Sequence, residues 1–428
     1  MDDDAEGDTD GDQFVRIARH VVEETRASTD LSWSHSQATA QVILSALHSH
    51  LRLPQLRAVL AALETDVLDV DRCPDALSLK AMVQQIGVMK GDQEERSWSL
   101  HEDADAVLSF LRDCDALICR ADPRVPLSLF LSPEDHYAPL THLSDLLQME
   151  QRRSVRLGLI RLLSSLCRLS PAVCRHLLLD TGLALELARD QMSLTSLRST
   201  GGGTVEAKSW IEQSLDLLTL LFAPGERMPF HYAEVLNRDW LLSVAAQGES
   251  GTRTLLAFSL QYCEEDPLDS PVLEAIKQSP AAREIGERLL AMANRASQGD
   301  PIWSSYPSKG IHSTTTTTSS ADGRPRHHSV LKLLKDLLMD PGAVEICLYS
   351  NDLAVLLDVC LRESLDLPPD QPLRAQFLEI LGLTIPAAPT GYRRAEIVEM
   401  LDTLSSSEEH QSTSDRKLVD QLRELVLT

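Results

Sequence analysis

The chain has 428 residues and a formal net charge of −24, which arises from 40 basic and 64 acidic side chains. Such a charge opposes contact with nucleic-acid phosphates and with anionic membrane surfaces, so neither is expected as a partner. Hydrophobic residues make up 43% of the chain but aromatic residues only 4%, which predicts a folded, all-α protein, because strands favour aromatic and β-branched side chains. The length exceeds the roughly 250–300 residues that one core usually organises, which predicts several domains or a stack of helices.

Residues 1–12 form a strongly acidic first segment. They hold six Asp, one Glu and no basic residue, which predicts a disordered, solvated tail. A calcium-binding loop around Asp8 is the alternative, but Gln13 stands where such a loop needs glycine, and Arg19 where it needs glutamate. We expect neither a signal peptide nor a membrane span, because the chain shows no basic and apolar leader and no long apolar run.

The clearest helical pattern covers residues 154–169. Its apolar stripe at helical spacing consists of Val155, Leu159, Leu162, Leu166 and Leu169. Arg161 and Arg168 project from the opposite side of the same helix. Ser170-Pro171 ends this helix and opens another, because proline suits the first position of a helix. Helix, short break and helix at this spacing are typical of HEAT and armadillo arrays, with repeats of about 40–47 residues.

Two long breaks interrupt the helical pattern. Residues 199–204 contain three consecutive glycines, which predict a flexible surface loop. Residues 302–327 contain five consecutive threonines and few apolar residues, which predicts a disordered linker. This linker divides the expected N-terminal part of the array, residues 13–301, from the C-terminal part, residues 328–428.

Residues 349–381 predict a helical hairpin. Asn351 and Asp352 are favourable N-cap types ahead of apolar residues at helical spacing. Pro368-Pro369 ends the first helix, and Pro372 opens the second. We expect the apolar face of the hairpin to be buried in packing; it includes Leu353, Leu356, Leu357 and Phe377.

The amino-acid sequence of this hairpin resembles the C-terminal signature of the WISH/DIP/SPIN family. The matching residues are Tyr349, Asn351-Asp352-Leu353, Leu356-Leu357-Asp358, Arg362-Glu363 and Asp366-Leu367-Pro368. Further blocks similar to the family occur in the same order along the chain, from about residue 96 to about residue 400. They are Arg96-Ser97-Trp98, Leu100-His101-Glu102, Gln148-Met149-Glu150, Arg152, Arg156-Leu157, residues 185–190, Asn294-Arg295, Asp300-Pro301, residues 328–332 and residues 334–338.

The resemblance implies an armadillo/HEAT-like helical repeat stack that is not an enzyme. It implies binding to the actin-related protein 2/3 (Arp2/3) complex and activation of that complex without a preformed mother filament. The product would be a linear actin filament, so that contact with the filament end is indirect. The implied location is the cytoplasmic actin cytoskeleton, including cortical patches. The chain shows no SH3 domain or proline-rich middle segment, so recruitment through SH3 ligands is not expected.

Other classes of repeat protein remain as alternatives. A generic armadillo-type adaptor in a cytoskeletal or trafficking assembly is the first of these, and a formin-type regulatory array is a weaker one. A nuclear-import receptor is excluded, because that class uses a ladder of Trp-x-x-x-Asn motifs. The fourth residues after the five tryptophans are Gln37, Glu102, Ser214, Val244 and Pro307, and none of them is asparagine.

The sequence carries no recognisable catalytic motif, so we expect no catalytic, cofactor-binding or metal-ligating residue and no cofactor. His48 and His50, like His327 and His328, are spaced wrongly for one helical face and are expected to be exposed. The eight cysteines are scattered, which is typical of reduced thiols.

Seven polar residues in the matched blocks are predicted to contact the partner. They are Gln148, Glu150, Arg152, Arg156, Asn351, Asp352 and Arg362.

Overall fold

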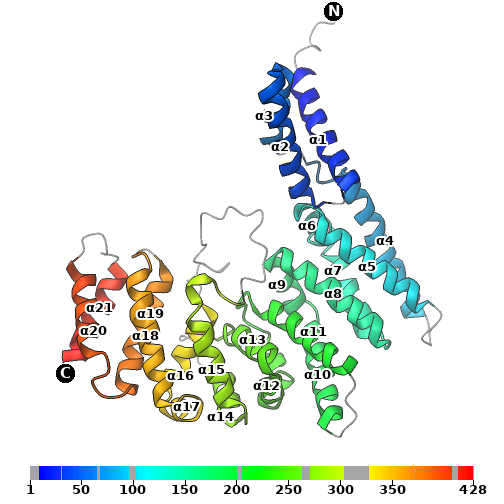
Figure 1. Cartoon of the computed structure of the whole chain (residues 1–428). Coiled ribbons are helices and arrows are strands. Elements are labelled where there is room, and N and C mark those ends of the chain that lie inside the picture. Colours follow the sequence, from blue (N-terminus) through cyan, green and yellow to red (C-terminus); the bar gives the residue numbers. More distant parts are fainter. Residues whose placement is uncertain are drawn as a thin grey trace, which may run out of the picture. The chain divides into compact units, whose positions relative to one another are not determined.

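The protein is described by a computed structural model. The described residues are 9–29, 31–64, 68–95, 103–199, 205–262, 270–302, 327–369, 371–406 and 413–427. Within these ranges the chain forms 21 α-helices and two short 3-10 helices and no strand, which confirms the all-α prediction (Figure 1). The chain divides into two compact units, Met1–Leu169 and Ser170–Thr428, here called the N-terminal and the C-terminal unit.

The N-terminal unit begins with a bundle of three helices that all pack on one another. They are α1 (Thr9–Thr29), α2 (Trp33–Leu51) and α3 (Pro54–Glu64), drawn in dark blue in Figure 1. Because α1 begins at Thr9, the last four residues of the predicted acidic tail are helical, while residues 1–8 lie outside the described residues. The side chain of Ser32 caps α2 by accepting a hydrogen bond from the backbone N–H of His35.

Five further helices complete the N-terminal unit. They are α4 (Pro74–Glu95), α5 (Ala104–Arg120), α6 (Arg124–Phe130), α7 (Ala138–Met149) and α8 (Arg153–Leu169). Helix α8 follows the predicted pattern: Val155, Leu159, Leu162 and Leu166 are buried, and Arg161 and Arg168 are exposed. It packs along α5, and α4 packs against α5, α6 and α7.

The C-terminal unit contains thirteen α-helices among its described residues. They are α9 (Pro171–Leu179), α10 (Leu183–Ser199), α11 (Val205–Phe222), α12 (Arg238–Ala245), α13 (Gly248–Ser259), α14 (Pro271–Gln278), α15 (Ala282–Ala293), α16 (Ser329–Met339), α17 (Pro341–Cys347), α18 (Ser350–Asp366), α19 (Pro372–Ala387), α20 (Arg394–Ser406) and α21 (Thr413–Leu427). The two 3-10 helices are η1 (Phe230–Glu234) and η2 (Ala296–Gln298).

These helices are organised in units of three. The sets are α9–α10–α11, η1–α12–α13, α14–α15–α16 and α17–α18–α19. The third helix of each set packs on the third helix of the next, from α11 through α13 and α16 to α19, and α19 packs on α21. Repeats of two or three helices are typical of HEAT and armadillo arrays, so the prediction of a helical repeat stack is confirmed. The choice of the armadillo class stays a prediction.

A repeated local signal starts the first helix of three sets. A capping side chain precedes a proline in each case: Ser170 before Pro171, Ser270 before Pro271, and Asp340 before Pro341. The side-chain oxygen of the capping residue accepts a hydrogen bond from the backbone N–H two residues further along the chain. The distance is 3.2 Å from Ala172 to Ser170 and 2.9 Å from Gly342 to Asp340. The backbone N–H of the first helical residue has no acceptor within the helix, so proline, which lacks this group, is well tolerated there. The capping residue and the proline together fix the start of the helix.

The predicted linker lies inside one three-helix set, because α15 precedes it and α16 follows it and the two helices pack together. The carboxylate of Asp300 accepts two hydrogen bonds from Ser329, one from its backbone N–H at 2.6 Å and one from its side-chain hydroxyl at 2.7 Å. These bonds connect the residues before the predicted linker with those after it. Ile302, at the predicted linker start, is buried. Residues 303–326 lie outside the described residues, and the boundary between the two compact units falls at residue 169 rather than in this segment.

The hairpin of residues 349–381 consists of α18 and α19, which pack on each other. Asn351 and Asp352 do not occupy the N-cap position, which corrects the prediction: Tyr349 does, and its backbone N–H donates to Asp352 Oδ2 at 2.8 Å. Asp352 therefore acts from the first turn of the helix, as the acidic residue of a capping box does. The predicted apolar face, Leu353, Leu356, Leu357 and Phe377, is buried.

One glycine permits close packing between sets. A Cβ at Gly286 of α15 would lie 2.1 Å from the carbonyl oxygen of Cys347, at the end of α17. We expect Gly286→Ala to lower the free energy of unfolding by about 1–3 kcal/mol or more, because backbone must move to admit the methyl group. Gly91→Ala in α4 is the matched control: nothing lies within 4 Å of its Cβ, so the helix should gain about 0.4–1 kcal/mol. Urea denaturation of both variants checks the pair, and equal shifts would refute the close contact.

Candidate functional site

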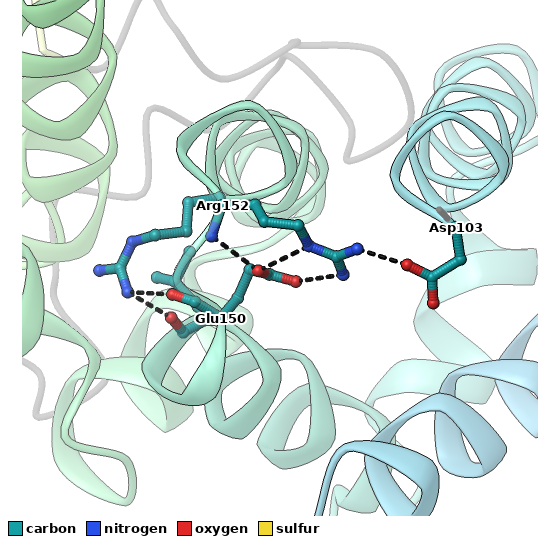
Figure 2. A network of polar contacts seen from close by, with 5 residues as sticks. Asp103, Glu150 and Arg152 are labelled. Carbon is teal, nitrogen blue, oxygen red and sulfur yellow. Dashed lines mark hydrogen bonds and ion pairs between the residues drawn. The ribbon is translucent and has the colours of Figure 1, made fainter. Parts of the chain in front are cut away.

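In the N-terminal unit, three predicted contact residues are tied together at the turn between α7 and α8 (Figure 2). Arg152 donates through Nε and Nη2 to the two oxygens of Glu150, at 3.0 and 2.8 Å, and through its backbone N–H at 2.7 Å. Its Nη1 forms an ion pair with Asp103, at the start of α5. These bonds raise the pKa of Arg152, with Glu150 as the largest cause.

Arg156 completes this network from inside the fold. Its side chain is buried, and Nη1 donates to the carbonyl oxygens of Leu147 at 2.7 Å and Glu150 at 2.9 Å. Carbonyl groups at the C-terminal end of a helix lack hydrogen-bond donors within the helix, so Arg156 supplies the donor that these carbonyl groups of α7 need. Glu150, Arg152 and Arg156 therefore hold the turn together, and charge reversal at Arg152 and Arg156 would test the fold more than a contact surface. Gln148, by contrast, is exposed on α7.

The remaining predicted residues lie on α18 of the C-terminal unit. Asn351, Val355, Asp358, Arg362 and Leu365 follow one another at intervals of four, three, four and three residues, so they form one stripe along the helix. All of them are exposed or half-buried, and Val355 and Leu365 expose 45% and 48% of their surface. The stripe combines apolar contact area with polar side chains held by a rigid helix.

Two neighbouring helices turn this stripe into an open surface groove. Its lining residues are Asn294, Val355, Asp358, Val359, Leu361, Arg362, Arg393 and Glu396, from α15 or its C-terminal cap, α18, and the start of α20. Arg362 Nη2 donates to Asn294 Oδ1 at 3.1 Å and to Glu363 Oε1 at 2.6 Å. The hydrogen bond to Asn294 connects two parts of the sequence that lie 68 residues apart.

The other wall of the groove comes from the turn before α20. Arg393, whose φ of 53° lies in the left-handed region, donates to Asp358 Oδ1 at 3.1 Å and to Glu396 Oε1 at 3.0 Å. The hydroxyl of Tyr392 donates to the other Asp358 oxygen at 3.1 Å. Hydrogen bonding to Glu396 raises the pKa of Arg393, and the pKa of Glu396 is lowered by a bond from its own backbone N–H and then by Arg393. Both side chains are thus held charged and in place.

Sequence reasoning found part of this groove. It selected Arg362, which lies in it, and Asn351, which lies on the same helical stripe, but it did not select Val355, Asp358, Arg393 or Glu396 as contact residues. Val355 and Asp358 could have been found, because they share the helical spacing of Asn351 and Arg362. Arg393 and Glu396 follow a separate turn, and no local pattern predicts that this turn folds back onto α18.

The histidine pairs behave differently from the prediction in one case. His50 and His327 are exposed and His48 is half-buried, but His328 is buried, so the expectation of exposure was wrong for this residue. It precedes α16, where its backbone N–H donates to Gln376 of α19 at 2.9 Å. Burial lowers the pKa of His328, because a charged imidazole loses its hydration there, and the nearby Asp300 opposes this shift.

The described residues contain neither a cluster of metal-ligand side chains nor a membrane-spanning helix. In the ranges given above, no three His, Cys, Asp or Glu side chains lie together as metal ligands would. None of the helices within those ranges is both long and apolar enough to cross a lipid bilayer.

Stacked three-helix sets and an open groove lined by rigidly held polar and apolar side chains define a helical repeat protein with a candidate protein-binding surface. Residues 248–396 match the family model of the SPIN90/Ldb17 leucine-rich domain, about a third of the chain. This match confirms, for that part of the chain, the resemblance to the SPIN90/WISH/DIP family seen in the sequence. The family is non-enzymatic and is linked to regulation of the Arp2/3 complex.

Proposed function

We propose that this protein binds the Arp2/3 complex and activates it to nucleate linear, unbranched actin filaments without a preformed mother filament. The observation that carries the proposal is the match of residues 248–396 to the SPIN90/Ldb17 leucine-rich domain. All eight residues that line the groove on α15, α18 and α20 fall inside this segment. The groove is therefore the proposed contact surface, with Arg362 and Asn351 among the contacts.

The mechanism is binding rather than covalent chemistry. A partner with several subunits is activated when the protein contacts its active arrangement better than its inactive one, because a ligand shifts an equilibrium only by its difference in affinity. The groove suits this task, since Arg362 and Arg393 are already held by neighbouring side chains and lose little conformational freedom on binding. No cofactor takes part. The proposed place of action is the cytoplasmic actin cytoskeleton, and contact with the filament end is indirect, through the complex.

Purified protein is expected to accelerate polymerisation of pyrene-labelled actin when the Arp2/3 complex of the same organism is present and no other activator or filament is added. Microscopy should show filaments that begin as unbranched rods. Arg362→Glu with Arg393→Glu should lower the activation by at least about ten-fold, because both charges in the groove reverse. Both side chains are about half exposed, so the fold should tolerate the change.

The matched control is Arg189→Glu with Arg238→Glu, which reverses two exposed arginines of the same unit outside residues 248–396. It alters the net charge equally and should leave activation unchanged. If wild-type protein has no effect on polymerisation and does not co-precipitate Arp2/3 subunits, the proposed function is wrong and a generic adaptor is the better description. If wild-type protein is active and the groove variant equally so, only the contact surface is wrong.

A further inference from the structure

Residues 31–63, here called the acid-free segment, differ in charge from the rest of the chain. They contain no Asp or Glu, although 64 of the 428 residues are acidic. The only Lys or Arg residues among them are Arg52 and Arg57, and both side chains are exposed. The segment spans α2 and nearly all of α3. This segment of a strongly acidic protein thus carries no carboxylate side chain of its own.

Helix α2 also carries exposed aliphatic side chains. One side packs into the three-helix bundle through Trp33, Ala40 and Leu44, which are buried. Further aliphatic residues, in the C-terminal half of α2 and just after it, are exposed. The exposed aliphatic residues, here called the α2 face, are Val42, Ile43, Leu47, Leu51 and Leu53, with exposed fractions of 70%, 50%, 43%, 57% and 47%.

The arrangement of the α2 face is that of a docking stripe. Ile43, Leu47 and Leu51 follow one another at four-residue intervals, which places them on one side of the helix over about 12 Å. Contiguous exposed apolar patches mark interaction sites. Arg52 and Arg57 lie at the C-terminal end of the stripe and give it a cationic end.

We propose that the α2 face binds an amphipathic helix of a partner protein, one that has an apolar stripe and carboxylates at one end. The apolar stripe covers Ile43, Leu47 and Leu51, and the carboxylates reach Arg52 and Arg57. Helix-in-groove recognition uses apolar anchors at this spacing, and opposite charges at the rim fix the register and direction. The site lies outside residues 248–396, so it does not depend on the proposed action on the Arp2/3 complex.

Charge disfavours the two other occupants of an apolar face. A second copy of the chain has the same cationic end and offers no carboxylate from its own acid-free segment to pair with Arg52 and Arg57. An anionic membrane extends well beyond the acid-free segment and would face the acidic surface around it. A single helix contacts only the segment itself, because more distant charges are screened over about 8–10 Å at physiological salt.

The test uses a fluorescein-labelled synthetic amphipathic helix with a leucine stripe and a run of glutamates at one end, titrated with the full chain. A matched peptide carries lysines in place of the glutamates. Wild-type protein should bind the glutamate peptide at least about ten-fold more tightly than the lysine peptide. Ile43→Glu with Leu47→Glu should weaken binding of the glutamate peptide at least about ten-fold, and Arg52→Glu with Arg57→Glu should remove the preference between the peptides.

Leu77→Glu with Val88→Glu is the control, because these two aliphatic residues of α4 are at least as exposed as Ile43 and Leu47 but lie outside the acid-free segment. It should leave binding unchanged. The proposal is overturned if the glutamate peptide does not bind, if the control weakens binding equally, or if the two peptides bind alike. It is also overturned if sedimentation equilibrium shows a dimer that Ile43→Glu with Leu47→Glu dissociates. Co-sedimentation with phosphatidylserine vesicles, lost in the same variant, would assign the face to lipid instead.

Discussion

Arg156→Glu is expected to destabilise the N-terminal unit by about 3–5 kcal/mol, the range seen when a buried charged group loses its partners. The wild-type guanidinium is buried and donates to the carbonyl oxygens of Leu147 and Glu150. A carboxylate in its place would face those oxygens without a donor of its own. It would also lie near the side chain of Glu150, which is 4% exposed. We expect a lower melting temperature and early loss of hydrogen-exchange protection in α7 and α8.

Arg153→Glu is the matched control for this change. Arg153 is exposed three residues earlier on the same helix, so the same reversal should alter the free energy of unfolding by less than about 0.5 kcal/mol. Equal effects of the two variants would show that burial does not distinguish these arginines, and the network in Figure 2 would be refuted.

Local patterns predicted much of the fold. The stripe of Val155, Leu159, Leu162 and Leu166 predicted α8 within one residue of its start, because apolar spacing reports which side of a helix meets the core. Ser170-Pro171 and Pro372 predicted the starts of α9 and α19, because capping and proline chemistry act within a few residues.

Contacts between distant segments could not be predicted in this way. Asp103 lies 49 residues from Arg152, and nothing in the local sequence around either residue signals their pairing. The same holds for His328, whose backbone N–H donates to Gln376 of α19, and for Arg393, which binds Asp358 from a turn 35 residues away. A matched polar residue therefore has two explanations, a partner contact or a structural bond, and only the packed fold separates them.

This distinction divides the predicted contact residues into two groups. Glu150, Arg152 and Arg156 hold the turn between α7 and α8, so their presence in a matched block is explained by the fold alone. Asn351 and Arg362 lie on the exposed stripe of α18, where the surface remains available to a partner. Gln148 is exposed and Asp352 supports the start of α18. The groove on α15, α18 and α20 is consequently the stronger candidate surface.

Leu356→Asp is expected to cost at least about 4 kcal/mol and to unfold the region around α18 at moderate temperature. Leu356 is fully buried, and a carboxylate there would lose its hydration without gaining a partner, while the leucine packing is lost as well. The adjacent change, Val355→Asp, should leave the melting temperature nearly unchanged, because Val355 exposes 45% of its surface. Thermal unfolding followed by circular dichroism measures both variants.

The two variants also separate folding from function. Val355 lies in the groove beside Arg362, so Val355→Asp should lower activation of the Arp2/3 complex several-fold in the pyrene-actin assay while the protein remains folded. Leu356→Asp should lose activation and helical structure together. If Val355→Asp is as active as wild type, the apolar part of the groove makes no contact with the partner. If Leu356→Asp melts like wild type, the burial of Leu356 in the packing around α18 is wrong.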